Sequence, residues 1–129
     1  MSYHVPPAPY AVFSSSQTQS VANIANAQAI TMNTTSLAKG ISLVSTTQIT
    51  LPQVGNYALS FSAIGHNSGS ANAKWMNIWL RKNGSDVANS STIVATAKDN
   101  PTTVVATFDM VCTTPGDYYE LMKIGRAHV

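Results

Sequence analysis

The sequence predicts an all-β domain built from antiparallel strands, and two adjacent segments carry that prediction. The first covers residues 56–65, where Tyr57, Leu59 and Phe61 alternate with small or polar residues. A period of two turns one face of a strand toward a core and the other toward water. This segment is therefore expected to be a half-buried strand.

The second segment, residues 75–82, has the same period. Met76, Ile78 and Leu80 alternate with Trp75, Asn77, Trp79 and Arg81. The run ends in Asn83-Gly84, which tolerates positive φ and is typical of a two-residue hairpin turn. The two segments together predict consecutive antiparallel strands.

Turn signals separate further strands at the spacing expected of a sandwich or barrel. The expected strands cover residues 10–20, 28–32, 41–51, 56–65, 75–82, 87–95 and 102–112, with a last strand beginning at Asp117. Residues 21–29 have some helix propensity, but their polar context favours a loop or an irregular strand. In the strand 102–112, Cys112 is in phase with Val104 and Phe108, which favours a buried small side chain over a reactive thiol.

Composition limits the classes of function. A chain of 129 residues fits one domain, and charged residues make up only 9% of it. The net charge of +2 includes Lys123 and Arg126, which lie in a suspect tail discussed below. Without them the chain is neutral and has no basic stripe, so we expect no nucleic-acid partner.

The N-terminal segment, residues 1–9, is Pro-rich and is expected to form an extended arm. It has neither a basic region nor an apolar run, so it does not resemble a secretory signal. No segment approaches the ~20 apolar residues of a membrane span, and we expect no membrane insertion.

No catalytic motif is present, and the chain is expected not to be an enzyme. Nucleophile elbows, zinc-protease motifs and phosphate-binding glycine loops are all missing from the sequence. The histidines, His4, His66 and His128, are far apart in the chain, and the acidic residues show no acid/base spacing. We therefore expect no catalytic residues, no metal site and no cofactor.

Binding is expected to reside in loops and on one strand face. Trp75 and Trp79 flank Asn77, and such a pair can stack on a sugar or pack within or between subunits, with packing favoured. The loops around residues 66–74 and 98–101 are further places for a ligand. The candidate ligand-binding residues are His66, Asn67, Lys74, Trp75 and Trp79.

Three motifs in order resemble the jelly-roll heads of the first complement component and the tumour necrosis factor superfamily. They are Gly55-Asn56-Tyr57, Arg81-Lys82-Asn83-Gly84 and Gly116-Asp117-Tyr118. The resemblance implies an antiparallel jelly-roll sandwich that assembles as a homotrimer. It makes Tyr57 and Phe61 candidates for the trimer interface, with an ordinary monomer core as the alternative.

The opening stretch VPPAPYAVFSSSQTQSVANIANAQAI and the phrase IWLRKNGSDVANS resemble tail-fibre or head-decoration modules of tailed bacteriophages. This resemblance implies a non-enzymatic structural and binding module of a virion, made in the host cytoplasm. Its partners would be other virion proteins and host surface polysaccharide. The alternative is a carbohydrate-binding or adhesion module encoded by a bacterium.

The last residues, Ile124–Val129, resemble a translated sequencing adapter, with Lys123 at the junction; the alternative is a genuine basic tail. This interpretation divides the chain into an arm (1–9), an incomplete jelly roll (10–122) and a non-native tail (123–129). A jelly roll without its closing strand or strands leaves the N-terminal strand unpaired. We therefore expect the chain, expressed alone, to aggregate through open sheet edges.

Overall fold

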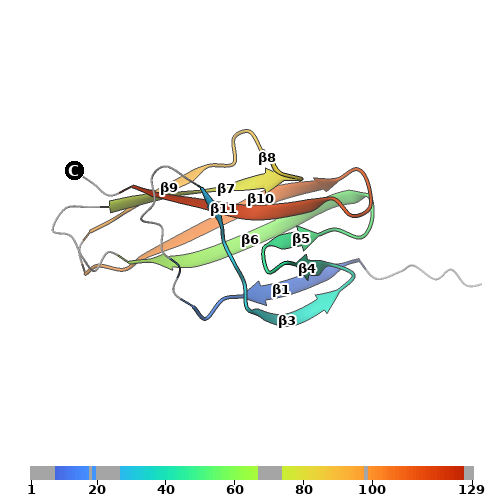
Figure 1. Cartoon of the computed structure of the whole chain (residues 1–129), viewed down its shortest axis with the longest axis horizontal. Coiled ribbons are helices and arrows are strands. Elements are labelled where there is room, and N and C mark those ends of the chain that lie inside the picture. Colours follow the sequence, from blue (N-terminus) through green and yellow to red (C-terminus); the bar gives the residue numbers. More distant parts are fainter. Residues whose placement is uncertain (1–7, 18, 20–26, 67–73, 98, 127–129) are drawn as a thin grey trace, which may run out of the picture.

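The computed structural model describes residues 8–17, 19, 27–66, 74–97 and 99–126, and the regular structure among them consists of β-strands (Figure 1). Every strand pair is antiparallel, as predicted. The strands are β1 (Tyr10–Ser14), β2 (Gln28–Ala29), β3 (Thr34–Lys39), β4 (Ser42–Val44), β5 (Gln48–Thr50), β6 (Gly55–Gly65), β7 (Lys74–Lys82), β8 (Ser85–Asp86), β9 (Thr92–Thr96), β10 (Thr102–Cys112) and β11 (Tyr118–Arg126).

The strands form one large sheet and two strand pairs. The large sheet has the order β4-β5-β11-β7-β8, with β2 added to β11 and β9 added to β7. The pairs are β6 with β10 and β1 with β3 (Figure 1). Buried side chains of the large sheet and of β10 belong to one hydrophobic cluster, an arrangement consistent with a β-sandwich.

The predicted alternation is confirmed along the long strands. The inward residues of β7 are buried, with Ile78 and Leu80 at 2% and 1% exposure. In β10, Val104 and Phe108 are buried in the same phase as Cys112, and the thiol of Cys112 lies in the core as expected. Alternate burial along both strands supplies the apolar surface that holds the layers together.

The predicted hairpin is also confirmed. Arg81 pairs with Asp86 and Lys82 with Ser85, so that Asn83 and Gly84 form the turn. Both have positive φ, 48° and 88°. Two positive φ values match the twist of the flanking strands, which is why Asn-Gly is favoured there.

The prediction of one strand over residues 41–51 is wrong in one respect, because this range contains two strands. Ser45 and Thr46 adopt positive φ and turn the chain between β4 and β5. Neither serine nor threonine favours positive φ, so the sequence pattern did not indicate this turn. The strand β3 was not predicted either, because all six of its residues are exposed and show no apolar alternation.

Other expected boundaries also differ from the structure. β1 ends at Ser14 rather than Ser20, β2 is much shorter than expected, and β9 begins at Thr92 rather than Val87. The last strand begins at Tyr118, because the carboxylate of Asp117 is buried in the preceding turn. The segment whose helix propensity we noted falls mostly on residues 20–26, outside the described part of the chain.

The expectation of an unpaired N-terminal strand is wrong. β1 pairs with β3 along its whole length. β11 lies in the middle of the large sheet and pairs with β7 from Tyr119 to Arg126. The residues Ile124–Arg126, assigned above to a non-native tail, thus continue a strand. Lys123 is 7% exposed with its Nζ 3.0 Å from Oε1 of Gln28, and burial lowers its pKa.

Candidate functional site

The outer face of β7 carries a row of large and polar side chains, here called the aromatic face. Its members are Trp75, Asn77, Trp79 and Arg81. Both tryptophans are half-buried, and Trp79 lies opposite Met122 of β11 on the same face. Opposed residues of paired strands interact on their shared face, so Trp79 packs partly within the subunit.

The β7–β8 hairpin fixes one end of the aromatic face. The indole Nε1 of Trp79 donates to Oδ1 of Asp86 at 2.9 Å, and Nε of Arg81 donates to the same oxygen at 3.0 Å. These hydrogen bonds, that of Trp79 first, together with the positive charge of Arg81, hold the pKa of Asp86 below its usual value. The result is a planar aromatic ring beside a charged polar pair.

Asn77 lies between the two tryptophans and is half-buried. Its side-chain Oδ1 is buried and has no hydrogen-bond partner among the described residues. A buried acceptor without a donor is uncommon and calls for an explanation. The aromatic face therefore combines two half-buried rings with an acceptor that is buried beneath its surface.

The loop candidates are only partly placed by the structure. His66 directly follows β6 and is exposed, and Lys74 is the first residue of β7. Asn67 lies outside the described residues. Across the described part of the chain, no group of three metal-ligating side chains comes together. The structure thus brings Trp75 and Trp79 onto one face but does not join them to a defined loop site.

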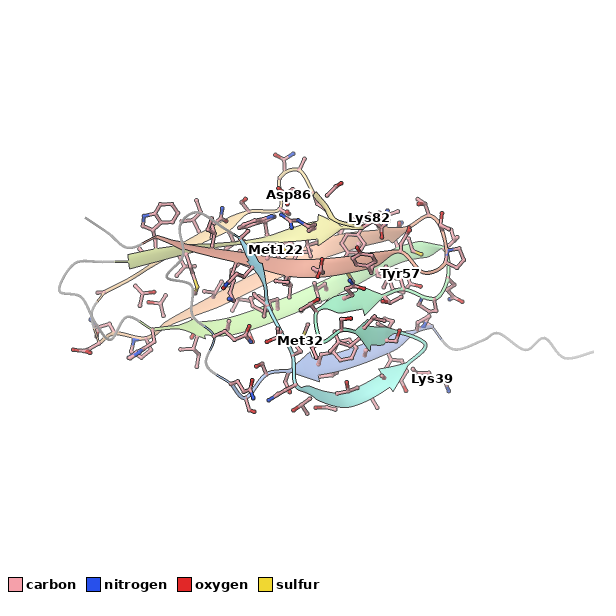
Figure 2. All side chains as sticks on the ribbon, in the orientation of Figure 1. Met32, Lys39, Tyr57, Lys82, Asp86 and Met122 are labelled. Atoms are coloured by element: carbon pink, nitrogen blue, oxygen red, sulfur yellow. The ribbon has the colours of Figure 1, made fainter. Side chains whose placement is uncertain are left out.

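Tyr57 and Phe61, the candidate trimer-interface residues, lie on the face of β6 that is turned toward the core. Both are half-buried and pack against the hydrophobic cluster. The hydroxyl of Tyr57 donates to the carbonyl of Gln53 at 2.8 Å, near the start of β6 (Figure 2). Their contacts are within the subunit, while the interface role stays a prediction.

Two of the sequence motifs meet around Asp117. Its Oδ2 accepts from the backbone N–H groups of Thr113 and Thr114 at 2.9 and 3.1 Å. Its Oδ1 accepts from Nδ2 of Asn83 at 3.1 Å, and Asn83 in turn accepts from the N–H of Tyr118 at 3.0 Å. The Asn-Gly hairpin and the Gly-Asp-Tyr turn therefore form one hydrogen-bonded network.

A cavity of about 380 Å³ lies between β1 and β6, and sequence reasoning missed it. Its walls include Ala11 and Phe13 from β1 and Tyr57 and Leu59 from β6, with Met110 among the core residues that line it. The volume falls within the ~300–1,000 Å³ typical of ligand sites. The two walls are distant in sequence and are not paired with each other, so no local pattern could have indicated the cavity.

No protein-family model matches the sequence, and no curated protein matches it either. Within the described residues there is no helix long and apolar enough to cross a membrane.

Proposed function

We propose that this chain is a non-enzymatic structural and binding module of a bacteriophage particle, in a tail fibre or a head decoration. In this proposal it adopts a tumour necrosis factor-like jelly roll, works as a homotrimer in contact with other virion proteins, and reaches the virion from the host cytoplasm. Support for a jelly roll comes from the antiparallel layers and from the network that joins its two sequence motifs.

The observation that carries the proposal is the outer face of the β6–β10 pair. Ile64, Val105 and Val111 on this face are 72%, 68% and 42% exposed. Asp109 is the only charged residue that alternates onto it; the other outward positions are small, polar or apolar. Three exposed aliphatic side chains among small and polar ones, with a single charge, favour burial of this face against other subunits, and closed symmetry would cover it in every subunit.

Host surface glycan is the ligand we propose for the assembled module, through the aromatic face. Trp79 beside the Arg81–Asp86 pair offers a ring for stacking and charged groups for hydroxyl contacts. A single face of this kind binds weakly, but three linked copies raise the effective affinity by mass action.

Light scattering of the freshly purified chain tests the assembly. We expect the mass of a trimer, and we expect Val105→Asp to convert it to a monomer, because a buried charge at the interface is costly. Ile93→Asp is the matched control: Ile93 is 63% exposed on β9 of the other sheet. A monomeric wild-type chain, or equal effects of both substitutions, would count against the trimer.

A second candidate function is a bacterial carbohydrate-binding or adhesion module, favoured by the two half-buried tryptophans that share one strand face. The two candidate functions differ in whether polysaccharide binding requires the trimer. For the bacterial module we expect the monomeric Val105→Asp variant to bind immobilised polysaccharide as well as the wild type does. For the phage module we expect binding to fall with the loss of the trimer.

A further inference from the structure

The tip of the β7–β8 hairpin is bound to the turn before β11 through Asn83. Nδ2 of Asn83 donates to Oδ1 of Asp117 at 3.1 Å, and Oδ1 of Asn83 accepts from the N–H of Tyr118 at 3.0 Å. The backbone N–H of Asn83 donates to the carbonyl of Tyr118 at 2.9 Å. Both ends of one carboxamide are therefore held by residues that lie 34 and 35 positions later in the chain.

The residue that follows Asn83 makes this carboxamide chemically vulnerable. Gly84 has no side chain, and apart from its chain neighbours no heavy atom lies within 4 Å of the position that a Cβ would occupy. Both residues are exposed to solvent, and the sequence contains no other Asn-Gly pair. The backbone nitrogen of Gly84 is therefore an unhindered nucleophile toward Cγ of Asn83.

The reaction that such a pair undergoes in water is deamidation, and water is its only co-reactant. The nitrogen of Gly84 bonds to Cγ of Asn83, the bond from Cγ to Nδ2 breaks, and ammonia leaves with the proton of the Gly84 amide. One water molecule then opens the resulting five-membered succinimide ring at either of its two carbonyl groups. The product is an aspartate, or an isoaspartate whose side-chain methylene becomes part of the main chain.

Hydrogen bonding in the folded chain opposes the first step. The carboxamide of Asn83 must turn toward the nitrogen of Gly84, and this motion breaks its hydrogen bonds to Asp117 and Tyr118. The bond to Asp117 has a charged acceptor, which makes it stronger than a bond between neutral groups. The same carboxylate is fixed by two backbone N–H groups of the preceding turn. The rate of deamidation is therefore set by how often this network opens.

Deamidation would place a second carboxylate against the first. The donor Nδ2 of Asn83 becomes a carboxylate oxygen at a position that lies 3.1 Å from Oδ1 of Asp117. Both carboxylates are charged at neutral pH, and like charges this close repel each other. Nζ of Lys82, 3.6 Å from Oδ2 of Asp117, offsets one of the two charges. An isoaspartate also lengthens the main chain of the two-residue turn, whose geometry depends on its length.

We propose that Asn83 is a site of spontaneous deamidation that the Asp117 network suppresses in the folded chain, and that the modification releases the β7–β8 hairpin from the turn before β11. The change runs in one direction, because the ammonia that is lost does not return. It makes the attachment of the hairpin depend on the age of the protein and on any condition that opens the network. The reaction requires neither the trimer nor a glycan.

Peptide mapping by mass spectrometry measures the reaction in the intact chain, incubated at mildly alkaline pH. We expect Asp117→Ala to deamidate at Asn83 at least about tenfold faster than the wild type, which corresponds to ~1.4 kcal/mol in the opening of the network. Tyr119→Phe is the matched control, because it weakens the fold through Val111 and leaves the partners of Asn83 in place. It should deamidate at the wild-type rate. Equal rates in the two variants would overturn the proposal.

Unfolding in urea keeps the test decisive if Asp117→Ala fails to fold. Asn89 serves as the internal control in the wild-type chain, because it is exposed and has a positive φ of 61° but makes no side-chain hydrogen bond to any described residue. We expect unfolding to accelerate deamidation at Asn83 at least about tenfold more than at Asn89. Equal acceleration at the two sites would contradict suppression by the network.

Aspartate substitutions test the release of the hairpin. Asn83→Asp reproduces one product of the reaction, and Asn89→Asp is its control. Aspartate and asparagine both tolerate positive φ, and the two positions have φ of 48° and 61°, so the backbone cost is matched. We expect Asn83→Asp to lower the urea midpoint and to speed hydrogen exchange at the N–H of Tyr118, and Asn89→Asp to change neither. An unchanged midpoint in Asn83→Asp would overturn the proposed release.

Discussion

The side chain of Asp117 joins the β7–β8 hairpin to the turn that precedes β11. Its carboxylate accepts from two backbone N–H groups and from Asn83, and it lies 3.6 Å from Nζ of Lys82. The hydrogen bond from Asn83 and those from Thr113 and Thr114 hold its pKa far below the ordinary value of 3.8. The charged form therefore belongs to the folded state.

This lowered pKa predicts the direction in which the stability of the protein changes with pH. Because folding depresses the pKa, the stabilising contribution is complete above about pH 4 and disappears as the pH falls below the unfolded value of 3.8. Asp117→Asn should lower the urea midpoint at neutral pH, and the gap to the wild type should narrow below pH 4. Urea titrations at several pH values measure this gap, and a gap that does not change with pH would contradict the assignment.

A second residue, Tyr119, stabilises the fold through its side-chain hydroxyl. Tyr119→Phe removes its two hydrogen bonds to Val111 and leaves the backbone groups of that residue without their partner. We expect a loss of about 1–3 kcal/mol in the free energy of unfolding. Tyr10→Phe, at a tyrosine that is 45% exposed, is the control and should change little. Equal losses of unfolding free energy in both variants would show that the hydrogen bonds of the Tyr119 hydroxyl do not account for the effect.

At the scale of elements, the β7–β8 hairpin depends on a glycine in the left-handed region. Gly84 has a φ of 88°, and no heavy atom lies within 4 Å of the position that a Cβ would occupy. Gly84→Ala therefore tests backbone strain without a steric clash. We expect a loss of about 1–2 kcal/mol in unfolding free energy, measured by urea denaturation. A neutral result would mean that the turn relaxes to another conformation.

The same scale shows what sequence could and could not predict. Asn83-Gly84 and the alternation in β7 and β10 were predictable because turn chemistry and one-sided burial are local signals. β3 could not be found, because a strand with both faces exposed has no apolar period. The turn at Ser45 and Thr46 was missed because tertiary context imposes its positive φ on residues that do not favour it.

The candidate sites also differ in how far the sequence could predict them. The aromatic face could be read from residues 75–81, because one strand carries it. The hydrogen bonds of Trp79 and Arg81 to Asp86 required the register of the hairpin. The cavity between β1 and β6 could not be predicted, because it is lined by two strands that are distant in sequence and do not pair.

For the whole molecule, β6 is an edge strand, because β10 is the one strand paired with it among the described residues. This edge predicts concentration-dependent aggregation beyond any defined oligomer. Ser60→Lys places a charge on this edge strand and should increase the soluble fraction after incubation at high concentration. Thr107→Lys is the matched control, since Thr107 pairs with Ser60 but belongs to β10. Sedimentation of both variants measures the effect, and equal rescue would mean that net charge, rather than the edge, governs aggregation.

The central place of β11 has a consequence for synthesis of the chain. This strand joins β5 and β2 to β7, yet it begins only at Tyr118. Tyr118 follows Lys82, the last residue of β7, by 36 residues, which a ribosome covers in roughly 2 to 7 s at ~5–20 residues per second. Throughout that interval β7 lacks β11, and the edge that β11 later covers remains open on the nascent polypeptide. Chaperones that shield nascent chains would therefore matter more for the yield of this protein than its size suggests.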